Sequence, residues 1–280
     1  LGTLDPGASG LLVLVLGAAT RCATVWQGGL KTYEATVRFG VVTSTQDLQG
    51  EVLEQREVAL DEAAVRAAAT GFVGAIAQVP PMVSALRVGG QRLYRLARRG
   101  ETVERRPRTV HVHAWEWLGF DLPEASFRVV VSGGTYVRTL AHDLGERLGV
   151  GGALKSLRRL RSEPFGIERA VAMRDLDRGT PTEVLERSGV PLAEALRVLP
   201  AVALDGPATA ELGFGRRPEV ARGDAPLAAG PRSVAFYGPD GGILALGELV
   251  PLEAPGAGGA DRALACPHVV FPWAVRQGRP

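Results

Sequence analysis

Residues 127–148 read FRVVVSGGTYVRTLAHDLGERL, and they contain the clearest structural signal in the chain. The run Phe127–Val131 is rich in β-branched residues and predicts a strand. Two glycines follow at 133 and 134. Apolar residues then recur at helical spacing, at Val137, Leu140, Ala141, Leu144 and Leu148. Glycines at 149 and 151 predict the end of that helix. A strand that leads directly into an amphipathic helix indicates a fold that combines sheet and helix.

Strand patterns also occur on the N-terminal side of this stretch. Apolar and polar residues alternate at 34–39, and a second strand is expected at 110–117. A polar turn at 121–124 would join the latter to the strand at 127–131. The uninterrupted apolar run LLVLVL at 11–16 predicts a buried strand, and it is far too short to span a bilayer.

Two further helices are expected between these strands. Asp61 is a suitable N-cap for a helix whose inner face would carry Val65, Ala69, Phe72 and Ile76. Pro80 and Pro81 interrupt the chain, and residues 93–99 then predict a short basic helix.

The composition changes past about residue 190, where glycine, proline and alanine become frequent. Short strands are expected at 233–236, 243–247 and 268–271, with a turn at 238–241. We therefore expect a mixed main domain of helices and sheet over residues 1–190, followed by a small β-rich domain over residues 191–280.

The overall composition indicates a globular chain. Apolar residues make up 46% of the 280 residues, which is enough for a sizeable core. Two cysteines, Cys22 and Cys266, cannot form a disulfide framework. With no signal peptide visible, we expect reduced thiols in a cytoplasmic protein that has no membrane partner.

The net charge is only +2, but arginines are concentrated in two places. Eight of them lie between Arg87 and Arg108, opposed by two glutamates, and a second group consists of Lys155, Arg158, Arg159 and Arg161. Such clusters suit a polyanionic partner. The alternative interpretation is that they are two solvated helix faces.

Two short segments contain candidate site residues. In GTLDPGASG, residues 2–10, Asp5 precedes a proline, so a rigid turn would present its carboxylate beside a loop of small residues. Tyr136 and Arg138 lie near the start of the helix after the two glycines, and helix N-termini and arginine both favour anions. Taken separately, each segment is also typical of an ordinary turn.

Taken together and in order, five segments resemble one known family. They read GTLDPGASGLLVLVLGAATR (2–21), KTYEATVRFG (31–40), PPMVSALRVGGQRLYRLARRG (80–100), SGGTYVRTLAHDLGERLGVGG (132–152) and LRRLRSEPFG (157–166). Over these residues the chain is similar to the TruB family of tRNA pseudouridine synthases. The resemblance implies an α+β fold, with a mixed, mainly antiparallel sheet in the catalytic domain and a small β-rich C-terminal domain that contacts RNA.

The resemblance also implies a substrate and a set of site residues. The substrate would be uridine 55 in the T-loop of tRNA, converted to pseudouridine by a monomer without a metal or an organic cofactor. The catalytic aspartate falls on Asp5 and the arginine that pairs with it on Arg138. The remaining positions are a base-stacking tyrosine at Tyr33, a second pocket tyrosine at Tyr136, a pocket leucine at Leu157, and a nearby basic residue at Arg21, where the family more often has lysine.

Several positions depart from the family pattern. The family usually has aspartate where Ser44 stands, His-Leu where Leu154 and Lys155 stand, and often glycine at Glu163. These differences concern local RNA contacts. The family motif is also preceded by Gly-His-Thr and by a first strand and helix, whereas the sequence starts at Leu1. We therefore expect an N-terminally shortened form, less stable and less active than an extended one.

The chemistry implied by the resemblance leaves some roles open. Asp5 would act as the nucleophile or as a base that starts elimination from the ribose. Arg138 would keep it ionised, and Tyr33 would stack on the base and could help to remove the C5 proton. A glycosidase or nucleosidase is a rival, but it usually needs a second carboxylate. Two further rivals are a guide-RNA-dependent relative and an RNA-binding or RNA-folding module without turnover.

Overall fold

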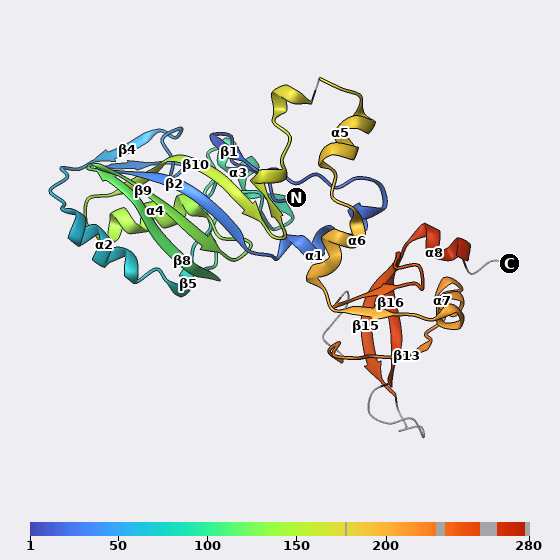
Figure 1. Ribbon diagram of the computed structural model, residues 1–280. Coiled ribbons are helices and arrows are strands. Elements are labelled where there is room, and N and C mark those ends of the chain that lie inside the picture. Colours follow the sequence, from blue (N-terminus) through green and yellow to red (C-terminus); the bar gives the residue numbers. More distant parts are fainter. Residues whose placement is uncertain (177, 228–232, 253–261, 278–280) are drawn as a thin grey trace. The chain divides into compact units, whose positions relative to one another are not determined.

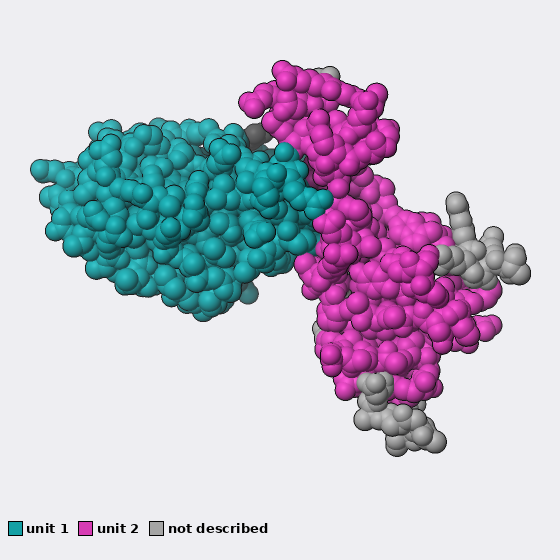
Figure 2. Space-filling model, viewed as in Figure 1, with its two compact units in different colours: residues 1–13, 26–170 teal, residues 14–25, 171–280 magenta. Residues whose placement is uncertain are grey.

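The computed structural model describes residues 1–176, 178–227, 233–252 and 262–277. The chain forms two compact units, which are described one at a time (Figure 2). The first unit comprises Leu1–Val13 and Trp26–Ala170, and the second comprises Leu14–Val25 and Val171–Pro280. No helix in these described ranges has both the length and the apolar character that a membrane crossing requires.

A seven-stranded sheet is the centre of the first unit (Figure 1). Its strands, in spatial order, are β1 (Ala8–Gly10), β10 (Gly152–Ser162), β2 (Lys31–Phe39), β9 (Glu124–Val131), β8 (Arg108–Asp121) and β5 (Gly74–Gln78), with β11 (Phe165–Gly166) paired to β10. The pairing of β1 with β10 is parallel and the others are antiparallel. The expected α+β fold with a mixed, mainly antiparallel sheet is confirmed.

Helices α4 (Val137–Arg147) and α2 (Glu62–Thr70) provide the apolar layer on one face of this sheet (Figure 1). The predicted inner face of α4 is buried, with Leu140, Ala141 and Leu144 fully inside the core. They pack in one cluster with alternate residues of β2 and β9, such as Val37 and Phe127. Each large apolar side chain buried in this way stabilises the fold by roughly 1.5–3 kcal/mol.

The predicted cap of α2 is confirmed, but the predicted length of the helix is not. The Asp61 carboxylate accepts a hydrogen bond of 2.7 Å from the amide of Ala64. The helix ends at Thr70, and Ile76 belongs to β5 instead. Gly74 has a φ of +103°, so the chain turns there through a conformation that few other residues adopt. The apolar residues at helical spacing therefore extend beyond the end of α2 into β5, so their spacing alone overestimated the length of the helix.

The prediction of a buried strand at 11–16 is wrong. The strand in this region is the short β1, and it ends at Gly10. Leu11 and Val13 are buried, whereas Leu12 and Leu14 are 50% and 74% exposed. A run of apolar residues without polar interruption does not show which side chains face inward, and here alternate ones do.

The second basic cluster lies on a strand, so its interpretation as a helix face is also wrong. Lys155, Arg158 and Arg161 are exposed along β10, but Arg159 is completely buried. The first cluster includes the short helix α3 (Leu93–Arg98), which confirms the predicted basic helix. A small hairpin of β6 (Arg87–Val88) and β7 (Gln91–Arg92) precedes α3, and another hairpin is formed by β3 (Val41–Thr43) and β4 (Val52–Gln55).

The second unit contains a five-stranded sheet. The strand order is β12 (Ala201–Ala203), β14 (Val234–Tyr237), β15 (Ile243–Pro251), β16 (Arg262–Val270) and β13 (Glu219–Ala221). Its helices are α5 (Pro181–Ser188), α6 (Leu192–Ala195), α7 (Gly206–Gly213) and α8 (Pro272–Gln277), while α1 (Ala23–Gln27) follows a 3-10 turn at Gly17–Cys22. A strand lies at each of the three places predicted near the C-terminus, but β15 and β16 are longer than expected, and β16 begins at Arg262 and ends at Val270. The assignment of catalytic and RNA-contacting roles to residues 1–190 and 191–280 stays a prediction.

Candidate active site

The Asp5 carboxylate projects from a tight turn at the edge of the first unit's sheet. The amide of Ala8 donates to the Asp5 carbonyl at 2.9 Å, which closes the turn, and β1 begins at Ala8. Ala8 lies opposite Leu157 in the parallel pairing of β1 with β10. The Asp5 side chain is 36% exposed, so the turn holds a carboxylate at the surface of the unit without burying it.

Arg138 binds this carboxylate with both arms of its guanidinium group. Nε donates to Asp5 Oδ2 at 2.8 Å and Nη2 donates to Asp5 Oδ1 at 2.9 Å. The arginine side chain is only 3% exposed, in contrast with its partner. This parallel two-bond geometry fixes the direction as well as the charge of the carboxylate.

The remaining donors of Arg138 are bound by other segments. Nη1 donates to the carbonyl of Thr45 at 2.9 Å, Nη2 also donates to the carbonyl of Val83 at 2.8 Å, and Asp47 Oδ2 lies 3.7 Å from Nε. Three segments of the chain, which contain Asp5, Thr45 with Asp47, and Val83, therefore converge on one guanidinium group. Because each contact restricts it, the group has little freedom to turn away from Asp5.

Gln78 places the start of α4, and thereby Arg138. The Gln78 side chain is buried at the end of β5, where its amide nitrogen donates to the Tyr136 carbonyl at 3.0 Å and its oxygen accepts from the Tyr136 amide at 2.8 Å. Tyr136 is the N-cap residue of α4, and Arg138 is in the first turn. Gln78 has no distinguishing pattern in the sequence, where it is a lone glutamine shortly before Pro80.

The loop after β3 supplies a second support for Arg138. Gln46 has a φ of +64°, which is uncommon for a residue other than glycine. Its side-chain oxygen accepts from Thr139 at 2.7 Å and its carbonyl accepts from the Leu154 amide at 2.9 Å. These bonds hold the Thr45 carbonyl and Asp47 beside the guanidinium group. At Ser44, where the family usually has aspartate, Oγ accepts from the amide of Glu51 at 3.1 Å and so stabilises the same loop.

Tyr33 and Leu157 lie on neighbouring strands of the sheet, close to the Asp5 turn. Tyr33 pairs in register with Arg159, and Leu157 is buried beside β1. Burial raises the pKa of the Tyr33 phenol, while the charge of Arg159 and a hydrogen bond from it act in the opposite direction; the charge of Asp5 raises it further. The net shift is upward, so the phenol stays protonated at neutral pH.

Arg21 is the one predicted site residue outside the first unit. It belongs to the second unit, where Nη1 donates to the carbonyl of Val270 at 3.0 Å. The other five predicted site residues are all in the first unit. Besides Asp5 itself, they lie on β2 (Tyr33), on β10 (Leu157) and at the start of α4 (Tyr136 and Arg138). The role of Arg21 as a basic residue near the site stays a prediction.

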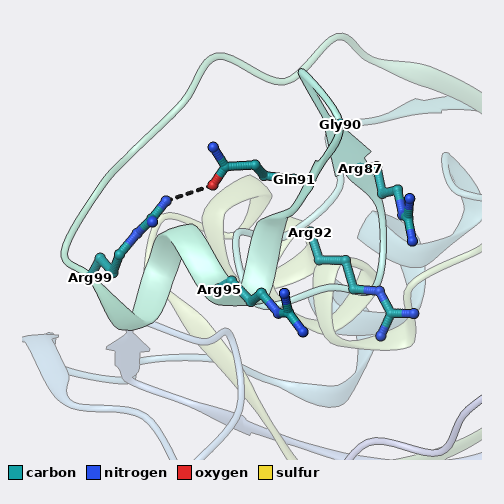
Figure 3. Close-up of a pocket in the computed structure, with 6 residues that line it drawn as sticks. All are labelled: Arg87, Gly90, Gln91, Arg92, Arg95 and Arg99. Atoms are coloured by element: carbon teal, nitrogen blue, oxygen red, sulfur yellow. Dashed lines mark hydrogen bonds between the residues drawn. The ribbon is translucent and has the colours of Figure 1, made fainter.

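A cationic pocket lies over the β6–β7 hairpin and helix α3 (Figure 3). It has a volume of about 650 Å³ and is lined by Arg87, Gly90, Gln91, Arg92, Arg95 and Arg99. Arg99 is engaged, since Nη2 donates to Gln91 Oε1 at 2.7 Å and Nε lies 2.8 Å from a Glu101 oxygen. Arg87, Arg92 and Arg95 form no ion pair with any described carboxylate. Their charges are therefore available to an anionic ligand.

This pocket is connected to the site by adjacent backbone bonds. The amide of Tyr94 in α3 donates to the Ser84 carbonyl at 3.1 Å, and the neighbouring Val83 carbonyl accepts from Arg138. Burial leaves the Ser84 hydroxyl without a partner among the described residues. The segment that contains Val83 and Ser84 thus links α3, which lines the pocket, to the buried arginine of the site.

Within the described ranges, no three His, Cys, Asp or Glu side chains come together in a way that could hold a metal ion. The chemistry available to the site is that of a partly exposed, well-oriented carboxylate, a buried guanidinium group beside it, and a phenol close enough to sense the charge of that carboxylate.

The fold of the chain is similar to the folds of chains in two solved structures. A chain in the crystal structure of a Cbf5–Nop10–Gar1 complex matches with a TM-score of 0.72 and 26% identity, covering 100% of this chain and 77% of that one. A structure of an H/ACA RNP bound to a substrate RNA containing 2′-deoxyuridine matches with a TM-score of 0.69 at 24% identity, covering 96% and 74%. These matches define the fold class to which the chain belongs.

Sequence comparison identifies the family within this class. Residues 1–137 match the "TruB family pseudouridylate synthase (N terminal domain)" and residues 138–197 match the "tRNA pseudouridylate synthase B C-terminal domain". The tRNA pseudouridine synthase B of Burkholderia mallei (strain NCTC 10247) is 49% identical over 216 residues, 77% of this chain and 71% of the relative. That of Thermobifida fusca (strain YX) is 43% identical over 257 residues, 88% and 83%. The chain belongs to the TruB family, as the five motifs predicted.

Proposed function

We propose that this chain converts uridine 55 in the T-loop of tRNA to pseudouridine, with Asp5 as its catalytic carboxylate. The observation that carries the proposal is the two-bond pairing of Asp5 with the buried Arg138. Relatives that are 43–49% identical are named tRNA pseudouridine synthase B, which supports tRNA as the substrate.

The proposed reaction is an isomerisation. The bond between C1′ of the ribose and N1 of the uracil breaks, the base turns, and a bond forms between C1′ and C5. N1 gains a proton and C5 loses one, so neither an oxidant nor an energy source is consumed. The base must leave its stack for this rearrangement, and bases presented in an RNA loop can do so at low cost.

The site residues have distinct roles in this proposal. Asp5 attacks C1′ or removes the proton that starts ribose elimination, and both routes require an ionised carboxylate. The adjacent guanidinium group of Arg138 favours that ionised state and aims it. Tyr33 stacks on the uracil, with Tyr136 and Leu157 completing the pocket. The partial exposure of Asp5 leaves its outer side open to the nucleoside.

The cationic pocket serves as a binding site for the phosphate backbone of the T-arm. Three of its arginines lack a carboxylate partner among the described residues, and the pocket is joined through Ser84 and Val83 to the guanidinium group of Arg138. Phosphate contacts of this kind position an RNA without reading its sequence. Residues 191–280 act as an accessory domain that adds to tRNA affinity, and the enzyme works as a monomer.

The decisive test compares Asp5→Asn with the wild type on an unmodified tRNA transcript. Asparagine keeps the shape of the side chain but cannot attack or accept a proton, so the rate at saturating enzyme should fall by about 10³-fold or more. The dissociation constant for tRNA should change by less than about threefold, since binding comes mainly from the basic surface. Asp121→Asn, at the exposed end of β8, is the matched control and should keep the wild-type rate.

The same experiment separates the rival functions. Pseudouridine mapped at position 55 in a transcript incubated with the purified protein alone excludes dependence on a guide RNA, and a transcript with cytidine at that position is the substrate control. Tight binding without any pseudouridine would indicate an RNA-binding or RNA-folding module. Retention of a tenth of the wild-type rate in Asp5→Asn would refute the role given to this carboxylate.

A further inference from the structure

Arg159 occupies an unusual position for a cation. It is the largest of the fully buried side chains among the described residues, with 1% of its surface exposed, whereas Arg158 and Arg161 on the same strand face solvent. A guanidinium group stays charged at any ordinary pH. Burying a charge costs several kcal/mol unless hydrogen bonds compensate for the lost water. The contacts of Arg159 should therefore show why it is retained.

Those contacts join the two ends of the Asp5 loop. Arg159 Nη2 donates to the carbonyl of Gly2 at 2.9 Å, and Nε donates to the carbonyl of Leu11 at 2.7 Å. The Arg159 carbonyl in turn accepts from the Leu11 amide at 2.8 Å. Gly2 and Leu11 lie on either side of Asp5 in the sequence, so this single residue fixes both ends of the segment that presents the carboxylate.

Charge compensation does not explain these contacts. No carboxylate of the described ranges forms an ion pair with Arg159. The partners of its guanidinium group are instead the two backbone carbonyls and the phenol of Tyr33, which lies opposite it in the pairing of β10 with β2. All of these partners are neutral, so none of them requires a positive charge to balance it. The contacts of Arg159 therefore serve to hold these groups in position.

The loop also leaves room for Arg159. Gly10 has a φ of +99°, and a Cβ atom at this position would overlap the Arg159 carbonyl oxygen. Gly2 has a φ of +62°, and a Cβ atom there would lie 3.3 Å from Nη1 of Arg159. Glycine thus stands at both places where the loop meets this residue most closely.

We propose that Arg159 is a positioning residue, which ties Gly2, Leu11 and the Tyr33 phenol together and so holds Asp5 in line with Arg138 and with the base that Tyr33 contacts. This inference rests on the proposed function, because it assigns a role within that reaction. The division of roles is specific. Arg138 binds the carboxylate itself, while Arg159 binds the backbone on both sides of it and never touches the substrate.

The contact with Tyr33 supplies a readout that does not depend on activity. Burial and the charge of Asp5 raise the pKa of Tyr33, and Arg159 opposes them through its charge and its hydrogen bond. Loss of the guanidinium group should therefore raise the pKa of Tyr33 further. Lysine keeps the charge but cannot reach two carbonyls and a phenol from one nitrogen with the spacing of a guanidinium group.

The experiment compares Arg159→Lys and Arg159→Met with Arg128→Lys. Arg128 is a suitable control because it lies on strand β9 of the same sheet, which β2 separates from β10, and it forms ion pairs with Glu34 and Glu116. Four quantities are measured for each protein: melting temperature, tRNA dissociation constant, single-turnover rate at saturating enzyme, and the titration of Tyr33 by NMR of ring-labelled tyrosine, assigned with Tyr33→Phe.

For both Arg159 variants we expect a rate about 10- to 100-fold lower, with a dissociation constant within about threefold of wild type, because a buried residue cannot contact RNA. The Tyr33 titration should move to higher pH in Arg159→Met and less in Arg159→Lys, and Arg128→Lys should match the wild type in all four measurements. If Arg159→Met does not fold, Arg159→Lys decides on the same criteria at a temperature where it is folded.

Two results would overturn the inference. The first is a wild-type rate in folded Arg159→Lys, and the second is a rate loss that merely follows the fraction of folded protein while the Tyr33 titration stays unchanged. Failure of the proposed function has a different signature, since the wild type and Arg128→Lys would then form no pseudouridine either. The Tyr33 titration would still report whether Arg159 controls this phenol.

Discussion

Replacing Arg138 with lysine tests the geometry of the site most sharply. The change retains a positive charge but removes the paired donors that hold Asp5 at 2.8 and 2.9 Å. A hydrogen bond to a charged group contributes roughly 1.5–3 kcal/mol, so two such bonds amount to about 3–6 kcal/mol. Because Asp5 is 36% exposed, water and the new ammonium group recover part of this, and the lower limit applies. About 3 kcal/mol corresponds to a rate loss of roughly 10²-fold.

The same substitution should also lower stability. An ammonium group cannot reach the carbonyls of Thr45 and Val83 while it contacts Asp5, so at least one buried carbonyl loses its donor, at about 1–3 kcal/mol. We therefore expect a lower melting temperature together with the lower rate. The distinction between the two effects requires that the rate be measured at a temperature where the variant is fully folded.

Single-turnover formation of pseudouridine at saturating enzyme is the appropriate assay for Arg138→Lys. Arg147→Lys is a matched control at the other end of α4, where the arginine donates to the Ala68 carbonyl at 3.2 Å and stacks over Phe72. The control should keep its rate within about twofold. If folded Arg138→Lys also stays within about threefold of wild type, the two-bond geometry is not what makes Asp5 reactive, and the reasoning fails.

Two further predictions concern the RNA-binding surface and the stability of the first unit. Changing Arg87, Arg92 and Arg95 to glutamine should weaken tRNA binding. The slope of log affinity against log salt concentration should become shallower by about 0.7 to 0.9 per lost phosphate contact. The control Arg66→Gln, which removes a partner of Glu62, should leave this slope unchanged. Asp143→Asn should raise the melting temperature at pH 7. Burial raises the pKa of Asp143, so its ionised form destabilises the fold above that pKa. The rise in melting temperature that asparagine gives should therefore shrink as the pH falls towards the pKa of the unfolded chain, about 4. A rise in melting temperature that does not vary with pH would contradict this.

The sequence predicted those parts of the molecule whose signals are local. The strand, the two glycines and the helix at 127–148 form as expected, because apolar spacing and turn residues act over a few positions. Asp5 and Arg138 are far apart in sequence, and only the family resemblance placed them together. Their bonds of 2.8 and 2.9 Å agree with that expectation.

The sequence could not show which side chains face inward or which distant segments of the chain contact each other. The run at 11–16 has no polar residue to mark its outer face, so its exposed leucines were missed. In the cluster at 155–161, Arg159 has the same side chain as its exposed neighbours, and only the register of β10 between β1 and β2 turns it inward. Gln78 and Asp47 were missed for the same reason, since their partners lie on other segments.

The difference in exposure between Asp5 and its partner explains how a charged pair can be both stable and reactive. A carboxylate enclosed by cations on every side would be ionised but inaccessible, whereas one in open water would be free to turn away from the substrate. Here Arg138, at 3% exposure, binds both oxygens from one side, and the 36% of Asp5 that remains exposed faces outward. Arg159 binds the backbone of the turn instead of the carboxylate, so it adds rigidity without occupying the oxygens. Two buried arginines therefore orient one carboxylate while leaving its outer side free for the nucleoside that we propose as its substrate.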